Sequence, residues 1–142
     1  MLELIVVVGI LIMATALSLP FFSSFQVDNT VRTNSDFLAQ SLRLAQIRAM
    51  AGYQGLDWGV YFDNTAKKFI VYAGSDYANR TTDLDLETSF DAVFNLSTDF
   101  GNEINFAIYS GLPSVNGTTT FSGSTEVTRY NTINSLGLIS AK

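Results

Sequence analysis

The chain has 142 residues, a formal charge of −5 and neither cysteine nor histidine. The missing residue types exclude disulfides, thiolate metal sites and a histidine-dependent catalytic triad, and the few scattered basic residues predict no nucleic-acid partner. Hydrophobic residues make up 47% of the chain, and they are concentrated at its start.

The first predicted element is an apolar helical stem over residues 1–27. No charged residue occurs between Glu3 and Asp28, a run of 24 positions. A helix needs roughly 20 mostly apolar residues to cross a bilayer, so the stem is expected to lie in a membrane. A cleaved signal peptide is the alternative, but its basic region and small-residue cleavage site are not evident. Pro20 predicts a kink or a local loosening, because proline removes a backbone donor.

Residues 28–52 predict a continuing amphipathic helix with two apolar stripes. We expect one stripe to pack on the rest of the chain, and it comprises Leu38, Leu42, Ala45 and Ala49. We expect the other stripe to face neighbouring chains, and it comprises Phe37, Leu44, Ile47 and Ala51. Gly52 and Gly55 are expected to end the helix. A helix that is continuous from residue 2 would be about 75 Å long at ~1.5 Å per residue.

The remainder, residues 53–142, predicts a β-rich head. Aromatic and β-branched runs between turn residues indicate short strands, at 58–62, 69–72, 92–95, 103–109, 118–121, 125–131 and 138–140. Their aromatic residues are expected in the core: Trp58, Tyr61, Phe62, Phe69, Tyr72, Phe106 and Tyr109. A long N-terminal helix followed by an antiparallel β-rich globular head is an α+β fold class.

The N-terminal residues resemble those of type IV pilins and pseudopilins. In that family a glutamate near the start precedes an aliphatic run and a proline, and here Glu3 lies 17 positions before Pro20. The family glutamate normally follows four residues of the mature chain, whereas two precede Glu3. We therefore expect that two further residues and a basic leader precede this sequence. A truncated gene start is the alternative, and it would put processing by the prepilin peptidase in doubt.

The head is similar to that of minor pseudopilins and fimbrial-transport-type (FimT/GspH-like) pilins. The segments that carry this resemblance are Asp36–Gln46, Trp58–Phe62, Ile104–Phe106, Gly111–Pro113 and Ile133–Ile139. Together with the N-terminal match, the resemblance covers most of the chain apart from about residues 74–102.

The resemblance implies a structural subunit of a type IV pilus and not an enzyme. Such a chain would form a homopolymer through its N-terminal helix, with the prepilin peptidase and the inner-membrane assembly machinery as partners and with no cofactor. It would lie in the inner membrane before assembly and in a pilus on the cell surface afterwards. The major pilin is the preferred assignment. The alternatives are a minor pseudopilin of a type II secretion system or a signal-anchored surface binding domain.

Three positions of the stem are candidate assembly residues. The resemblance implies that Glu3 pairs with the N-terminal amine of an adjacent subunit, because an unpaired carboxylate costs about 2.5–3.5 kcal/mol at the centre of a bilayer. Glu3 at the membrane interface, where that cost is small, is the alternative. Gly9 and Pro20 would let the stem bend or partly unwind.

Two weaker patterns concern the head. Asp83, Asp85 and Glu87 could supply oxygen ligands to Ca²⁺, although the sequence has no EF-hand loop and a solvated acidic loop is the preferred interpretation. Three matches to the N-glycosylation pattern begin at Asn79, Asn95 and Asn116. Matches of three residues arise readily by chance in a chain rich in Asn, Ser and Thr.

Overall fold

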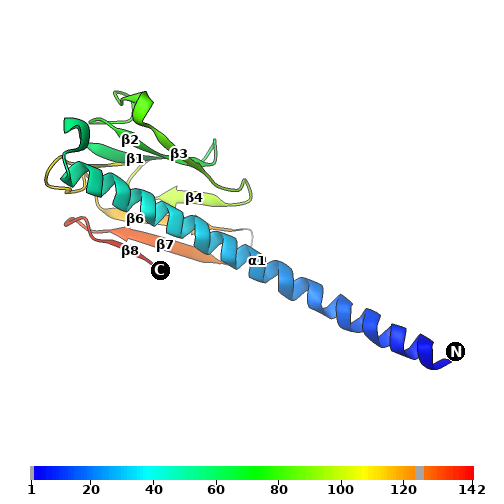
Figure 1. Cartoon of the computed structure of the whole chain (residues 1–142). Coiled ribbons are helices and arrows are strands. Elements are labelled where there is room, and N and C mark those ends of the chain that lie inside the picture. The colour runs from blue at the N-terminus through cyan, green and yellow to red at the C-terminus, as the bar shows by residue number, and fades with distance from the viewer. Residues whose placement is uncertain (1, 124–126) are drawn as a thin grey trace.

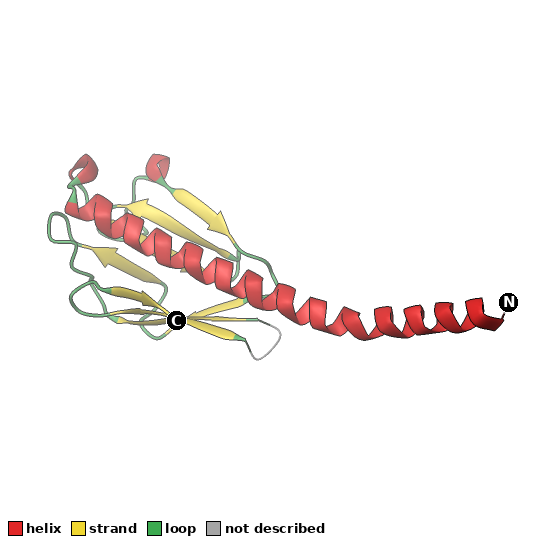
Figure 2. Ribbon diagram, turned by 60° about the horizontal axis from the view of Figure 1, so that its bottom comes forward, coloured by secondary structure: helices red, strands yellow, loops and turns green. Residues whose placement is uncertain are grey.

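A computed structural model describes residues 2–123 and 127–142, and the side chains of Leu2 and of residues 16–25 lie outside that description. A long helix, α1 (Leu2–Met50), extends well beyond a β-rich head that packs against its C-terminal half (Figure 1). The N-terminal end of α1 lies far from the head in both views (Figure 2). The predicted α+β fold, with its helix first and its antiparallel head after, is confirmed.

Within the described residues, the head contains two antiparallel four-stranded sheets and two short 3-10 helices. The first sheet has the order β3-β2-β1-β5 and the second has the order β4-β6-β7-β8. The bounds are η1 Tyr53–Gly55, β1 Trp58–Asp63, β2 Lys68–Ala73, η2 Thr82–Leu84, β3 Leu86–Ser89, β4 Asn95–Thr98, β5 Glu103–Phe106, β6 Gly117–Ser122, β7 Thr128–Ile133 and β8 Ile139–Ala141.

The hairpin of β1 and β2 forms where the sequence predicts it. Asp63 is paired with Lys68 at the end of the ladder. The Asp63 carboxylate accepts hydrogen bonds from the backbone N–H groups of Thr65, at 3.0 Å, and Ala66, at 2.8 Å. Aspartate favours turns because its side chain can bond in this way to backbone groups just downstream.

The core lies between α1 and the two sheets, because α1 packs against strands of both. The predicted head-facing stripe is confirmed, since Leu38, Leu42, Ala45 and Ala49 are fully buried. Burial of a leucine side chain contributes roughly 1.5–3 kcal/mol, so this stripe fixes the head on the helix. The largest buried partners from the sheets are aromatic, and they include Trp58, Phe69, Phe106 and Phe121. Tyr72 is buried as well, but it lies outside this core and its hydroxyl group donates to Glu103.

Two strand predictions are wrong in their bounds. The strand expected at 103–109 ends at Phe106, because the chain then turns back and the N–H of Tyr109, which has a φ of 62°, donates to the carbonyl of Ala49. Tyr109 is therefore 74% exposed and not a core residue. The strand expected at 92–95 begins at Asn95 instead, because the residues before it form a turn. In this turn the Asp91 carboxylate accepts from the N–H of Val93 and the Asp91 carbonyl oxygen accepts from the N–H of Phe94.

The edge strand β3 is not predicted by the sequence. Its residues, Leu86–Ser89, are mostly exposed, so they carry little of the apolar alternation that marks a half-buried strand. The strand expected at 125–131 corresponds to β7, which begins at Thr128, and residues 125 and 126 lie outside the described residues.

Candidate assembly surface

The N-terminal part of α1 presents an apolar surface that the head does not cover. We call residues 4–13 the stem surface. All of its large apolar side chains are between 44% and 70% exposed: Leu4, Ile5, Val6, Val7, Val8, Ile10, Leu11, Ile12 and Met13. A soluble monomer rarely exposes a contiguous apolar patch of more than a few hundred Å². The stem surface is therefore a candidate interaction surface.

The hydroxyl group of Thr15, two residues beyond the stem surface, is satisfied within α1. Its Oγ1 donates to the carbonyl oxygens of Leu11, at 2.9 Å, and Ile12, at 3.0 Å, within the same helix. Among the described residues no helix is both long enough and apolar enough for a membrane crossing. The predicted stem also includes residues 16–25, whose side chains lie outside that set.

The three candidate assembly residues are spread along α1 and do not meet within one chain. Glu3 is exposed in the first turn of α1, where a negative charge is favoured by the helix dipole. Within the described residues its carboxylate has no ion-pair partner. A Cβ atom added at Gly9 would meet nothing within 4 Å, so Gly9 is not required for packing inside the chain. The helix continues through position 20, but the Pro20 side chain lies outside the described ones and the predicted kink stays a prediction.

The second predicted stripe of the helix lies on the solvent side. We call Phe37, Leu44, Ile47 and Ala51 the outer stripe. Phe37 is 47% exposed, Leu44 36% and Ile47 58%, and Ala51 is exposed as well. The outer stripe therefore presents apolar side chains on the same helix as the stem surface, on the face that the head leaves open.

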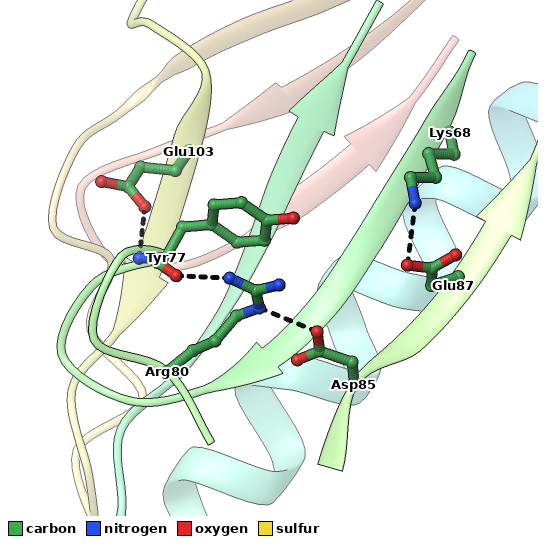
Figure 3. A network of polar contacts seen from close by, with 6 residues as sticks. All are labelled: Lys68, Tyr77, Arg80, Asp85, Glu87 and Glu103. Carbon is green, nitrogen blue, oxygen red and sulfur yellow. Dashed lines mark hydrogen bonds and ion pairs between the residues drawn. The ribbon is translucent and has the colours of Figure 1, made fainter. Parts of the chain in front are cut away.

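The acidic residues that could have held Ca²⁺ are not brought together around one point. Asp85 accepts from Nε of Arg80 at 2.7 Å and Glu87 accepts from Nζ of Lys68 at 2.8 Å (Figure 3). Asp83 lies exposed in η2. Within the described residues no group of three or more acidic side chains could hold a metal ion. Asp85, just before β3, and Glu87, within β3, therefore form ion pairs with basic side chains of the head.

The same polar network holds the segment after β2 on the first sheet. Arg80 donates to the carbonyl oxygen of Tyr77 at 2.9 Å and lies over its ring, with Cζ 3.8 Å from the centroid. The Tyr77 ring stacks on that of Tyr61, with 3.8 Å between centroids, and the Tyr77 N–H donates to Glu103 at 2.9 Å (Figure 3). The hydrogen bond to Asp85 raises the pKa of the Arg80 guanidinium. This segment is thus a packed part of the head.

Comparison with solved structures identifies the fold, whereas no family model and no curated protein sequence matches the chain. The minor pseudopilin EpsH from the type 2 secretion system of Vibrio cholerae aligns with a TM-score of 0.62 and 14% identity, over 80% of this chain and 96% of EpsH. The type IV minor pilin FimU of Pseudomonas aeruginosa aligns with a TM-score of 0.61 and 13% identity, over 78% of this chain and 91% of FimU. The chain has the type IV pilin fold.

In this pilin fold the three candidate glycosylation residues all lie on the surface of the head. Asn79, Asn95 and Asn116 are exposed. The side-chain amide of Asn79 donates to Asp76 at 2.9 Å, and this bonding lowers the pKa of the Asp76 carboxyl. Glycosylation of these residues stays a prediction.

Sequence analysis missed an apolar cluster at the end of this pilin fold that lies farthest from the stem. Gln46 donates to the carbonyl oxygens of Gly111, at 3.2 Å, and Gly137, at 2.9 Å. These bonds join two turns to the end of α1. The exposed apolar side chains around this junction are Met50, Tyr109, Leu112, Leu136 and Leu138. These segments become neighbours only in the tertiary structure, because the two turns are distant from each other and from α1 in the sequence.

Proposed function

We propose that this chain is a subunit of a type IV pilus-like filament and that it polymerises through α1. The observation that carries this proposal is the division of one helix into two environments. One stripe of its C-terminal half is fully buried under the head, while the stem surface and the outer stripe stay exposed. Such a helix can hold its own head and still contact helices of other copies.

The stem surface would serve in two places. In a membrane its side chains contact lipid tails, and in a filament they contact the equally apolar stems of neighbouring copies. Transfer between lipid and a neighbouring helix changes the apolar environment little. Subunits can therefore move from the membrane into the filament, and back, without a large loss of hydrophobic free energy.

Glu3 would set the position of each new subunit. Its carboxylate is exposed in the first turn of α1, so it is free to accept a positive group from another copy. A carboxylate in the apolar core costs about 2.5–3.5 kcal/mol. Pairing with the N-terminal amine of an adjacent subunit offsets that cost only in the correct register. Gly9 and Pro20 would supply the local bending of the stem.

Within this function the major pilin remains our prediction, and a minor subunit is the second candidate. The likeness to EpsH and FimU, both described as minor subunits, fits the second candidate equally well. The proposed partners are further copies of this chain, the prepilin peptidase and the inner-membrane assembly machinery. The proposed location is the inner membrane before assembly and the cell surface afterwards.

Mass spectrometry of filaments sheared from cells tests the proposal. If this chain dominates the preparation it is a major pilin, and if it is present in small amounts beside another pilin it is a minor subunit. Its complete absence from the filaments would favour the signal-anchored binding domain.

A pair of matched variants tests the role of the stem surface. Leu11→Lys places a charge in the stem surface, where Leu11 is 59% exposed, and we expect it to abolish incorporation into filaments. Leu136→Lys makes the same change on the head, where Leu136 is 78% exposed, and incorporation should persist. Equal incorporation of both variants would contradict polymerisation through the stem.

A further inference from the structure

A polar pocket of about 210 Å³ lies between α1 and the second sheet. Its lining residues are Arg32, Ser35 and Asp36 from α1 and Arg129, Ala141 and Lys142 from the end of the sheet. Residues 130 and 142 are tied by two backbone hydrogen bonds of 2.9 and 2.8 Å, so the last residues of the chain are held beside β7. Strand β8 runs toward the stem (Figure 1).

The pocket is basic on an acidic protein. Three of the eight basic residues of a chain with net charge −5 line it: Arg32, Arg129 and Lys142. The carboxylate among its lining residues is Asp36. Asp28 lies beside the pocket, and its Oδ1 is 3.4 Å from an Nη atom of Arg129. Counted by side chains, three basic groups stand against two carboxylates, and this excess of one positive charge favours an anionic ligand.

The pocket also holds hydrogen-bonding capacity that the described part of the chain does not use. Nε of Arg129, which lines the pocket, is buried and has no hydrogen-bond partner there. Ser35, another lining residue, is already occupied, because its carbonyl oxygen and its Oγ accept from the side-chain amide of Asn131 at 3.2 and 3.0 Å. A buried N–H group without a partner is unusual in a native protein. An acceptor oxygen of a ligand bound beside Arg129 would give this donor a partner.

The position of the pocket along α1 suggests which anion is near. The charge-free run ends at residue 27, so Arg32 lies about 7.5 Å further along the axis at ~1.5 Å per residue. The hydrocarbon core of a bilayer is about 30 Å thick and the headgroups bring the total to about 40–45 Å. The headgroup layer on each side is thus about 5–7.5 Å thick, and a stem whose charge-free run ends at the edge of the hydrocarbon core places Arg32 at the outer edge of the headgroups.

We propose that this pocket binds the phosphate of an anionic phospholipid while the stem lies in the membrane. The inference rests on the membrane location in the proposed function. Guanidinium groups bind phosphate through paired, charge-assisted hydrogen bonds, and Arg32 and Arg129 supply two such groups from opposite walls. Binding at this point would hold the head at a fixed height above the membrane before assembly. The bound lipid is released when the subunit enters a filament.

Lipid retention by the full chain in vesicles tests this site. The chain is incorporated into phosphatidylcholine vesicles with and without added phosphatidylglycerol, and bound lipid is measured by native mass spectrometry. We expect preferential retention of phosphatidylglycerol. Arg129→Gln and Lys142→Gln each remove one basic group from the pocket. Each should lower the amount of retained phosphatidylglycerol by about fivefold.

Arg129→Lys separates the site from general attraction to the membrane. It keeps the positive charge but removes the paired hydrogen bonds of a guanidinium, so retention should fall at a phosphate site and stay unchanged under general attraction. Arg43→Gln removes a positive charge from α1 outside the pocket lining, and it should retain phosphatidylglycerol like the wild type. Lys142→Gln changes an exposed side chain at the end of the chain, so its effect does not depend on correct folding of a core residue. Equal retention in the wild type and both pocket variants would overturn the proposal.

Two further outcomes are informative about the source of the phosphate. If 10 mM inorganic phosphate (a concentration chosen to be about a hundredfold above a modest Kd) displaces no phosphatidylglycerol, the lipid assignment stands. If inorganic phosphate binds in phosphatidylcholine vesicles and phosphatidylglycerol is not preferred, the ligand is free phosphate and the lipid assignment is overturned. Flotation of the vesicles in a density gradient shows whether the chain is bound to them. A chain that binds neither kind of vesicle contradicts the membrane location and this inference together. A chain that binds both kinds without retaining phosphatidylglycerol preferentially contradicts this inference alone.

Discussion

The side-chain amide of Asn131 in β7 donates to the backbone carbonyl and the hydroxyl oxygen of Ser35 in α1, across 96 positions of sequence. Asn131 is fully buried and Ser35 is 3% exposed. A buried hydrogen bond between two elements restricts how one can slide along the other, because any other register leaves polar groups unpaired. This contact therefore fixes the position of the second sheet along the helix.

Asn131→Ala should lower the free energy of unfolding by about 1–3 kcal/mol, since it leaves the Ser35 groups buried without their donor. The measurement is urea unfolding of the full chain in detergent. The control is Thr132→Ala, because Thr132 is exposed on the same strand and its loss should change stability by less than about 0.5 kcal/mol. Equal effects of both variants would show that the Asn131 contact does not hold the sheet.

Leu42→Ala and Leu44→Ala should separate folding from assembly. Leu42 is fully buried under the head, whereas Leu44 is 36% exposed on the outer stripe. We expect Leu42→Ala to cost about 2–5 kcal/mol of stability, because it leaves a cavity in the core. Leu44→Ala should leave urea unfolding nearly unchanged and reduce the yield of filaments. Normal filament yield in Leu44→Ala would argue against contacts through the outer stripe.

Glu3→Gln tests whether the charge near the start of α1 is used between subunits. The change keeps the size of the side chain and removes its charge, and Glu3 contacts no cation within the described chain. We therefore expect unchanged unfolding of the head and a strong loss of filament incorporation. Incorporation at the level of the wild type would place Glu3 at the membrane interface without a role in register.

Gly9→Ala tests the proposed flexibility of the stem. The added methyl group would meet nothing within 4 Å in the chain, and alanine favours a helix over glycine by about 0.8–1.0 kcal/mol. The stem should become more helical, as measured by circular dichroism, while the head unfolds as before. If bending at Gly9 is used in assembly, filament yield falls; an unchanged yield would remove Gly9 from the assembly residues.

Alkaline unfolding should report on Tyr72. Burial raises the pKa of this phenol above its ordinary value of 10.0, because the charged form is disfavoured away from water. A group whose folded pKa is raised contributes stability that is complete below the unfolded pKa and is lost as pH rises above it. The stability of the wild type should therefore fall more steeply above pH 10 than that of Tyr72→Phe. Parallel curves for the two proteins would contradict the buried, protonated phenol.

Elements with a strong local pattern were predictable from the sequence. The four residues of the head-facing stripe recur at helical spacing and are all buried, and the Asp63 turn lies between two runs of β-branched and aromatic residues. Tyr109 shows the limit of this reasoning, because its aromatic side chain fits a strand pattern while its backbone is held in a turn by Ala49. Strand β3 was missed because an exposed edge strand needs no apolar alternation.

By itself the sequence determined the long helix, its apolar stem, its two stripes and the antiparallel class of the head. Each of these follows from residues that are close in the chain, because periodicity and turn chemistry are local properties. The tertiary structure alone decided the order of the two sheets, the contact of Asn131 with Ser35 and the pocket between Arg32 and Arg129. The last two of these features join residues about a hundred positions apart, and which distant groups meet depends on how the whole core packs.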